Sequence, residues 1–167
     1  TMDKIETAKY LLERIGMPPQ QQSTLCRLTL LAMTNIKKKG KFEDATNEWI
    51  RIHDVIEFID KEYGILYAEN SRETFRKQAM HHFRTAAIIE DNGKATNSPN
   101  YRYRITPEFL KVIRSIQEPN GMSAHEDDEF EINSFLYRHQ SLKDIYASKK
   151  QMLKMPVKIN GKVFDFS

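Results

Sequence analysis

Hydrogen-bond donors and positive charges concentrate between residues 70 and 84. The donors of this segment are Arg72, Thr74, Arg76, Lys77, His81 and Arg84, and Glu73 is its one acid. Arginine and lysine donate to guanine edges and to phosphates, and threonine donates or packs on a thymine methyl. The segment therefore predicts a helix that reads a DNA groove. A solvated cationic face on an ordinary core helix is the alternative.

A second set of donors follows between residues 92 and 106, where no acid occurs. Its candidates for DNA contact are Lys94, Asn97, Ser98 and Arg102. The small polar residues, glycine and proline of this stretch predict a loop, and such loops commonly contact phosphates or the minor groove. Ordinary solvation of a loop explains the same composition nearly as well.

Motifs that would carry catalysis are not discernible. The chain has no glycine-rich phosphate loop, no HExxH, and no Pro-Asp followed by a spaced acid-x-Lys, the pattern that holds magnesium in a nuclease. His81 and His82 point about 100° apart on a helix, and no cysteine supports them, because Cys26 is the single cysteine. We therefore predict no catalytic residue and no metal ligand, and Cys26 as a small buried hydrophobic side chain.

Composition bounds the class of protein. The 167 residues are 40% hydrophobic and 29% charged, as in a soluble globular domain, and the net charge is only +3. No apolar run approaches the roughly 20 residues of a membrane span, and the acids of the first residues do not fit a secretory signal. With one cysteine, these features predict a cytoplasmic protein that does not contact a membrane.

Periodicity predicts the elements that would position the donors. Apolar residues at helical spacing indicate helices over about 5–15, 21–35, 52–63, 70–86 and 107–116, and alternation indicates strands over 88–91 and 101–105. Three of the four helices before the strands, a two-stranded wing and a closing helix make a winged helix-turn-helix domain, which we expect over residues 3–118. The fold class is thus mainly α with a small β wing.

The basic helix and the wing each have a predicted orientation. Asn70 with Glu73 three residues later predicts a capping box at the start of the helix. The residues expected on its apolar face are Phe75, Ala79, His82, Phe83 and Ala86, with Met80 on a polar face. In the second strand Tyr101 and Tyr103 alternate with Arg102 and Arg104, so one pair faces the core and the other faces outward.

The last third of the chain is predicted to form an appendage to this domain. We expect an acidic linker over 119–130, a connecting helix over 131–155, and a terminal β-hairpin over 156–167 with a turn at Asn160-Gly161. A lone hairpin is marginally stable in water. The hairpin is therefore expected to be the start of a truncated C-terminal domain.

Several segments resemble the N-terminal domain of the BsuBI/PstI type II restriction endonucleases. The resemblance lies in Asn70-Ser71-Arg72-Glu73-Thr74-Phe75-Arg76-Lys77-Gln78-Ala79, in Thr96-Asn97-Ser98-Pro99, in Tyr103-Arg104-Ile105 and in Leu28-Thr29-Leu30-Leu31-Ala32-Met33. The ending, from Lys149-Lys150 through Met155-Pro156-Val157-Lys158, resembles that family's entry into its catalytic domain. The resemblance covers essentially the whole chain.

This resemblance implies a two-domain enzyme that cuts both strands of DNA at a short palindrome, works as a homodimer and uses Mg²⁺ in a C-terminal nuclease domain. It implies that these 167 residues bind double-stranded DNA and hold no cofactor themselves. DNA-contacting roles carry over to Arg72, Thr74, Arg76 and Lys77 in the helix and to Asn97 and Ser98 in the wing.

Two other functions compete with this interpretation. A winged-helix transcription regulator would use the helix near residues 131–153 to dimerise. A protein-interaction module is the third possibility, because a fold does not fix a function and winged helices also bind proteins.

Overall fold

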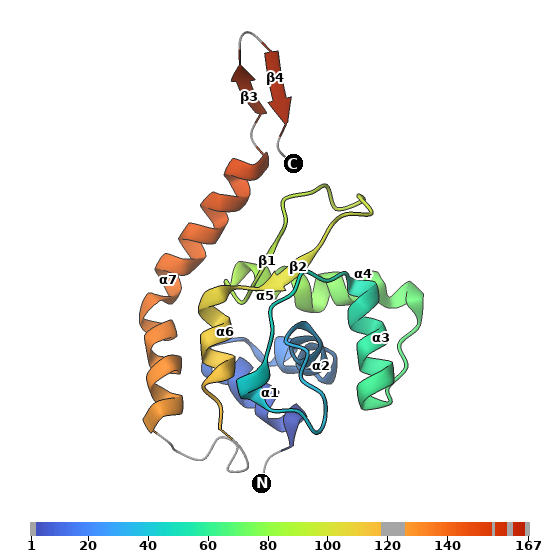
Figure 1. Cartoon of the computed structure of the whole chain (residues 1–167), viewed down its shortest axis with the longest axis vertical. Coiled ribbons are helices and arrows are strands. Elements are labelled where there is room, and N and C mark those ends of the chain that lie inside the picture. The colour runs from blue at the N-terminus through green and yellow to red at the C-terminus, as the bar shows by residue number, and fades with distance from the viewer. Residues whose placement is uncertain (1–2, 118–125, 155, 160–161, 166–167) are drawn as a thin grey trace.

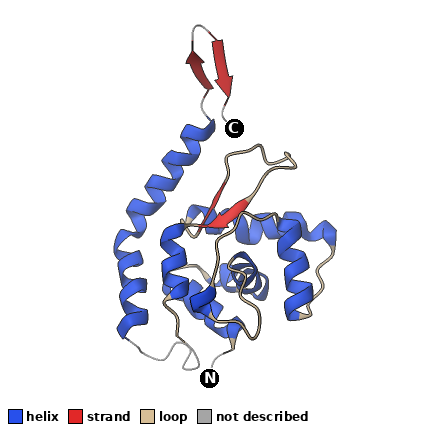
Figure 2. Cartoon of the chain, in the orientation of Figure 1, coloured by secondary structure: helices blue, strands red, loops and turns tan. Residues whose placement is uncertain are grey.

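The computed structural model describes residues 3–117, 126–154, 156–159 and 162–165. Helices α1 (Lys4–Arg14), α2 (Thr24–Met33), α3 (Ile52–Tyr63) and α6 (Pro107–Arg114) surround a common core, and a small β-hairpin lies over one end of it (Figures 1 and 2). A long helix, α7 (Glu126–Lys154), runs along the outside and leads to a second hairpin, β3 (Pro156–Ile159) and β4 (Lys162–Asp165). The predicted class, mainly α with a small β wing, is confirmed.

Helix α2 occupies the centre of the domain because it is apolar on nearly every face. Leu28, Leu30, Leu31 and Met33 are all buried in the core. The Ser23 side chain begins the helix by accepting the backbone N–H of Cys26. Cys26 is buried as predicted, and its burial raises the pKa of the thiol.

Helix α3 ends at Gly64, whose φ of 71° suits a residue without a Cβ, and the next seven residues turn the chain into the basic helix. The basic helix (residues 72–85) comprises α4 (Arg72–Phe75), a π-helical turn (Arg76–Met80) and α5 (His81–Thr85). The predicted capping box does not form. Asn70 lies in a 3-10 turn (Glu69–Ser71), and the Glu73 carboxylate turns to Arg76 instead.

The π-helical turn changes which side chains of the basic helix are buried. The N–H of His81 bonds to the carbonyl of Arg76, five residues back, so the turn is wider than in an α-helix. Phe75, Ala79 and Phe83 face the core as predicted. Met80, predicted on a polar face, is also fully buried, since the wider turn rotates it toward the core.

The wing consists of β1 (Ile89–Asp91), β2 (Tyr103–Ile105) and the loop between them. The strands are antiparallel, with Ile89 opposite Ile105, and both are shorter than predicted. The backbone of Ile50 adds an unpredicted bridge to Tyr103 through two hydrogen bonds of 2.8 Å. Tyr101 and Tyr103 lie on one side of the strand with their rings edge to face, 4.9 Å apart.

Helix α6 begins at Thr106, whose hydroxyl accepts the N–H of Phe109 and donates to the carbonyl of Ala87. Helix α7 packs on α6, where the rings of Phe109 and Phe135 are 5.1 Å apart. It begins at Glu126 rather than near residue 131, so the acidic run expected in the linker lies in its first turn. Acids are favoured there by the helix dipole.

The second hairpin pairs Val157 with Phe164, in agreement with the prediction, while the predicted Asn160-Gly161 turn lies outside the described residues. Among the helices that the structure describes, none is both long enough and apolar enough to cross a bilayer.

Candidate nucleic-acid interface

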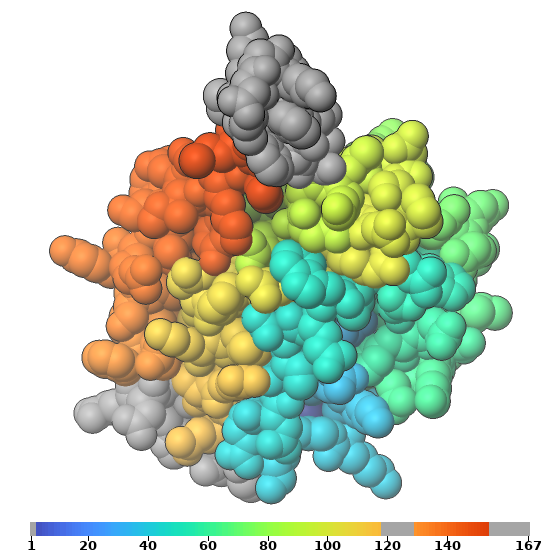
Figure 3. All heavy atoms as spheres, turned by 45° about the horizontal axis from the view of Figure 1, so that its top comes forward, coloured from blue at the N-terminus to red at the C-terminus, as the bar shows by residue number. Residues whose placement is uncertain are grey.

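The start of the basic helix and the wing loop face each other across one groove of about 780 Å³. Arg72 and Arg76 line it from the helix, and Asn97 and Ser98 line it from the loop. Tyr101 also lines it, at the base of the loop. In Figure 3 the yellow-green atoms of the wing and the green atoms of the neighbouring helices lie on the same face of the molecule. We call this feature the helix–wing groove.

The side chains of the cations in and beside the groove are largely exposed, and each has an acid close by on the basic helix or in the turn before it. The Arg76 guanidinium holds the Glu73 carboxylate through two hydrogen bonds, one of them 2.9 Å from Nε, and Lys77 Nζ lies 3.8 Å from the same carboxylate. Arg72 Nε lies 3.7 Å from Glu69. Exposed pairs of this kind contribute little to stability. Their guanidinium groups are therefore available to exchange a carboxylate for a phosphate.

Thr74, Lys77 and His81 are exposed on the basic helix but do not line the groove itself. The pKa of His81 is lowered, first by partial burial and then by the nearby positive charges of Arg84 and Arg76. The imidazole is thus held neutral near pH 7 within a positive environment.

The wing loop is shaped by its own side chains. The Arg102 guanidinium donates to the carbonyls of Pro99, at 2.7 Å, and Tyr101, at 2.9 Å. Ser98 Oγ accepts the N–H of Asn100 at 3.1 Å. Arg102 thus braces the loop from within rather than lining the helix–wing groove, whereas Lys94 and Asn97 are exposed at the surface of the loop.

Arg84, predicted to contact DNA, points away from the groove. Its guanidinium lies 3.0 Å from the Asp91 carboxylate and 3.2 Å from the Tyr101 hydroxyl. The side chain therefore joins the end of the basic helix to the first wing strand.

Two residues of the groove were missed by the sequence reasoning. Arg51, the N-cap of α3, and His53, in the first turn of that helix, also line it. Arg51 forms a salt bridge of 3.0 Å with Asp54, and His53 Nδ1 lies 3.0 Å from Glu69. A basic residue before a helix and a histidine in its first turn carry no distinctive local pattern, so only the packing of α3 beside the basic helix reveals them.

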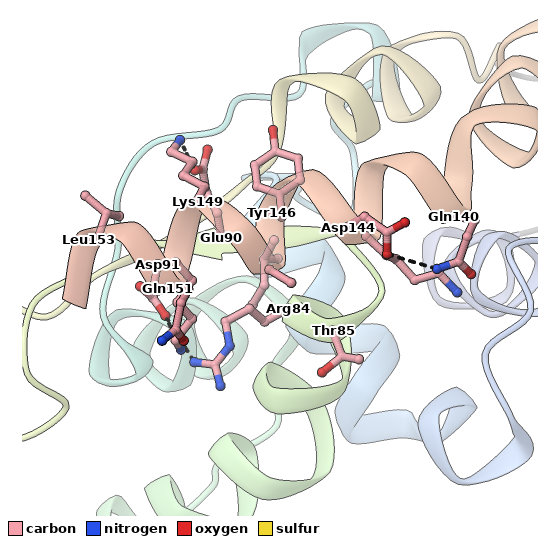
Figure 4. A pocket seen from close by; sticks show the side chains of 14 residues that line it. Arg84, Thr85, Glu90, Asp91, Gln140, Asp144, Tyr146, Lys149, Gln151 and Leu153 are labelled. Atoms are coloured by element: carbon pink, nitrogen blue, oxygen red, sulfur yellow. Dashed lines mark hydrogen bonds and ion pairs between the residues drawn. The ribbon is translucent and has the colours of Figure 1, made fainter. Parts of the chain in front are cut away.

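On its other side, the wing is fixed to α7 by two buried acids, Glu90 and Asp91, which we call the β1 carboxylates. Lys149 Nζ lies 2.7 Å from Glu90, and Lys150 Nζ lies 2.8 Å from Asp91 (Figure 4). Arg104 also pairs with Glu90, at 2.9 Å, and stacks over Trp49. The β1 carboxylates and the two lysines line a cleft of about 520 Å³ between α7, the basic helix and β1.

Several hydrogen bonds keep Asp91 charged despite its burial. Burial alone would raise the pKa of its carboxyl, but the hydrogen bonds from Lys150, the Gly93 N–H and the Tyr101 hydroxyl hold it below its usual range. The Tyr101 pKa is raised in turn, by burial first. A continuous path of contacts therefore links a groove residue, Tyr101, to α7.

Comparison with known proteins identifies the family. The family model described as "BsuBI/PstI restriction endonuclease HTH domain" matches residues 2–151 of this chain. The chain belongs to the BsuBI/PstI restriction endonuclease family. The type II restriction enzyme BsuBI of Bacillus subtilis is 33% identical over 161 residues, which are 93% of this chain and 48% of that enzyme.

A more distant relative and a solved structure agree with this placement. The type II restriction enzyme AplI of Arthrospira platensis is 27% identical over 156 residues, 91% of this chain and 46% of that enzyme. The structure of SdaI restriction endonuclease superposes with a TM-score of 0.72 at 23% identity, covering 96% of this chain and 50% of that one. At that identity the match supports the fold alone. The chain spans about half the length of each of these relatives.

Among residues 3–117 and the other described ranges, no group of three or more histidine, cysteine or acidic side chains is arranged to hold a metal ion.

Proposed function

We propose that these 167 residues are the DNA-binding part of a type II restriction endonuclease that cleaves double-stranded DNA at a short palindrome. One observation carries the proposal: the basic helix and the wing loop line a single groove, with Arg72, Arg76, Asn97 and Ser98 facing into it. In winged helix-turn-helix proteins a helix enters the major groove while neighbouring segments hold the backbone. The family membership supports the same function.

In this proposal the contacts divide by type. The exposed guanidinium groups of Arg72 and Arg76 and the hydroxyl of Thr74 reach base edges or nearby phosphates. Lys77, Lys94, Asn97 and Ser98 contact the phosphate backbone and so fix orientation without reading sequence. Arg84 and Arg102 act indirectly, because each is bonded within the wing or to its base.

In this proposal, catalysis and its metal ion are not assigned to these 167 residues. We assign cleavage and the Mg²⁺ ions it needs to the half of the relatives that this chain does not match. We further propose that the enzyme acts as a homodimer, since a palindrome presents the same half-site twice, and that it works in the cytoplasm.

Binding to a labelled 20-base-pair duplex, followed by fluorescence anisotropy between 50 and 200 mM salt, tests the proposal. We expect affinity to fall steeply with salt, and the double variant Arg76→Ala/Lys77→Ala to bind about tenfold more weakly or worse, with a shallower salt dependence. The matched control is Lys37→Ala/Lys38→Ala, which removes the same charge from an exposed loop that does not line the groove.

Two results would contradict the proposal. Equal losses in the two double variants would mean that net charge, not the groove, drives binding. No binding at 50 mM salt would favour the protein-interaction module instead.

A further inference from the structure

Four large apolar side chains lie exposed on one helix, α7. Phe130, Tyr137, Ile145 and Met152 are 66%, 93%, 55% and 70% exposed. At 100° per residue they fall within about 80° of one another around the helix axis, on the face opposite the buried Ile132. Figure 3 shows α7, in orange, along one edge of the molecule with side chains projecting outward. We call this face the α7 stripe.

Serines fill the positions between these side chains. The stripe runs as Phe130, Ser134, Tyr137, Ser141, Ile145, Ser148 and Met152, so that each large side chain is followed by a small one. The spacings are three or four residues throughout, which is the condition for one helix to pack its side chains between those of another.

The alternation of large and small side chains along the stripe, and the spacing between them, are the same in both directions. Ser141 is its midpoint; Tyr137 and Ile145 lie four residues to either side, and Phe130 and Met152 lie eleven. A two-fold axis through Ser141 would therefore place Tyr137 of one copy beside Ile145 of the other. The same axis would place Phe130 of one copy beside Met152 of the other, so large side chains lie beside large ones. Such symmetry is the requirement for an isologous contact, in which one patch meets itself.

The charges of α7 favour the antiparallel arrangement. Residues 126–131 hold five acids and no base, while residues 143–154 hold four lysines and one acid. Glu129, Lys149 and Lys150 already form ion pairs within the chain. For the remaining charges, an antiparallel pair brings the acidic end of each helix to the basic end of the other, whereas a parallel pair would place like charges together. Neighbouring charges of opposite sign select orientation in paired helices.

The exposed area is sufficient for a stable contact. Large side chains bury on the order of 150–250 Å² each when covered. Four side chains exposed to this degree contribute roughly 500 Å² a copy, so two copies bury about 1,000 Å², the lower bound for a specific interface. A patch of this size is comparable to the largest apolar patch of a typical monomer, and such patches are often functional.

From these observations we infer that the α7 stripe is the surface through which two copies of this chain associate, with their α7 helices antiparallel and the two-fold axis at Ser141. The inference deepens the homodimer part of the proposed function and rests on that part alone. DNA binding by the helix–wing groove is a separate property of each copy.

Cysteine cross-linking at the axis is the sharpest test. In the antiparallel pair, Ser141→Cys meets itself and forms a disulfide-linked dimer under mild oxidation. Ser134→Cys and Ser148→Cys are the matched controls, because each lies about 21 Å from its own copy along the pair (seven residues from the axis, twice, at 1.5 Å each). We expect neither control variant to form a disulfide-linked dimer by itself. A mixture of the two should form a disulfide-linked heterodimer, because position 134 of one copy lies beside position 148 of the other. The native Cys26 is buried and does not contribute.

Sedimentation of the full chain without DNA gives the second measurement. We expect a dimer, and Tyr137→Glu raises its dissociation constant about 30-fold or more, the size of an interface hot spot. Leu66→Glu is the control, since Leu66 is 78% exposed and lies in the segment between α3 and the basic helix rather than on α7. Thermal melts confirm that both variants fold.

Three outcomes overturn the inference: a wild-type monomer at high concentration, no Ser141→Cys dimer, or single controls that link as well as Ser141→Cys does, which would indicate a parallel or random contact. Binding to a duplex is measured separately, so a failure here leaves the DNA-binding proposal standing.

Discussion

The two sides of the wing contain the same kinds of ion pair and differ in burial. In the helix–wing groove, Arg76 holds a Glu73 side chain that is 56% exposed. At the base of the wing, Arg84 holds an Asp91 side chain that is 2% exposed. A carboxylate in water releases its arginine readily, whereas a buried carboxylate would be left without solvation. Burial therefore separates cations that are free to engage a ligand from those that hold the fold.

The strongest way to break this comparison is Asp91→Ala. The change leaves Arg84 and Lys150 without the carboxylate that pairs with both, and removing one partner of a buried network costs about 3–5 kcal/mol. We expect a loss near the lower end of that range, because both cations reach partly into solvent. Urea unfolding followed by circular dichroism measures it.

Glu73→Ala is the matched control for this variant, since it removes an exposed carboxylate from an equivalent arginine pair. Its unfolding midpoint should stay close to the wild-type value. If Asp91→Ala unfolded at the same urea concentration as Glu73→Ala, burial would not distinguish the two regions.

The sequence predicted the groove better than it predicted the base of the wing. Arg76 and Asn97 were expected on one surface because a periodic helix and a polar loop are local patterns, and both line the groove. The pairing of Asp91 with Lys150 joins residues 59 positions apart. No local pattern specifies such a contact. The assignment of Arg84 to DNA rested on its place in the basic helix, and the structure adds its pairing with Asp91, seven residues further on.

The same reasoning explains the errors in individual elements. A constant 100° per residue placed Met80 on a polar face, but the π-helical turn rotates it into the core. The acids before residue 131 resembled a linker, because charge composition does not separate a linker from an exposed first helical turn. The predicted cap at Asn70 gave way to a 3-10 turn, since Glu73 bonds to Arg76 instead.

A smaller effect, opposite in direction, should follow from Glu73→Gln. The Arg76 guanidinium donates to the Glu73 carboxylate and holds the pKa of that acid below its usual range. The charge also lies at the groove, where it repels phosphate. The amide keeps the size of the side chain and removes this repulsion, so we expect severalfold tighter DNA binding in anisotropy titrations.

Glu43→Gln is the matched control, because it also removes one exposed acid paired with a cation, Lys41, from a segment that does not line the groove. A similar gain in both variants would reflect net charge alone. A loss of affinity in Glu73→Gln would contradict this prediction and show that the carboxylate positions Arg76 for DNA.

The smallest expected effect concerns His81 and sharpens the comparison further. The pKa of its imidazole is lowered in the free protein, by partial burial first and then by the positive charges of Arg84 and Arg76. DNA phosphates near the helix would offset those charges, so the pKa should be higher in the complex. Binding then takes up a proton. Affinity should therefore rise as pH falls through the pKa of the complex, and level off below the lowered pKa of the free protein.

Anisotropy titrations between pH 7.5 and 5.5 at constant salt measure this rise, which we expect to be a few-fold. His81→Gln should lose it in part, and His53→Gln is measured beside it because His53 is a second histidine that lines the groove. His139→Gln serves as a distant control, since its ring bonds to the carbonyl of Ala86 beneath α7. If His81→Gln kept the full rise while His53→Gln abolished it, phosphate would lie along α3 rather than along the exposed flank of the basic helix.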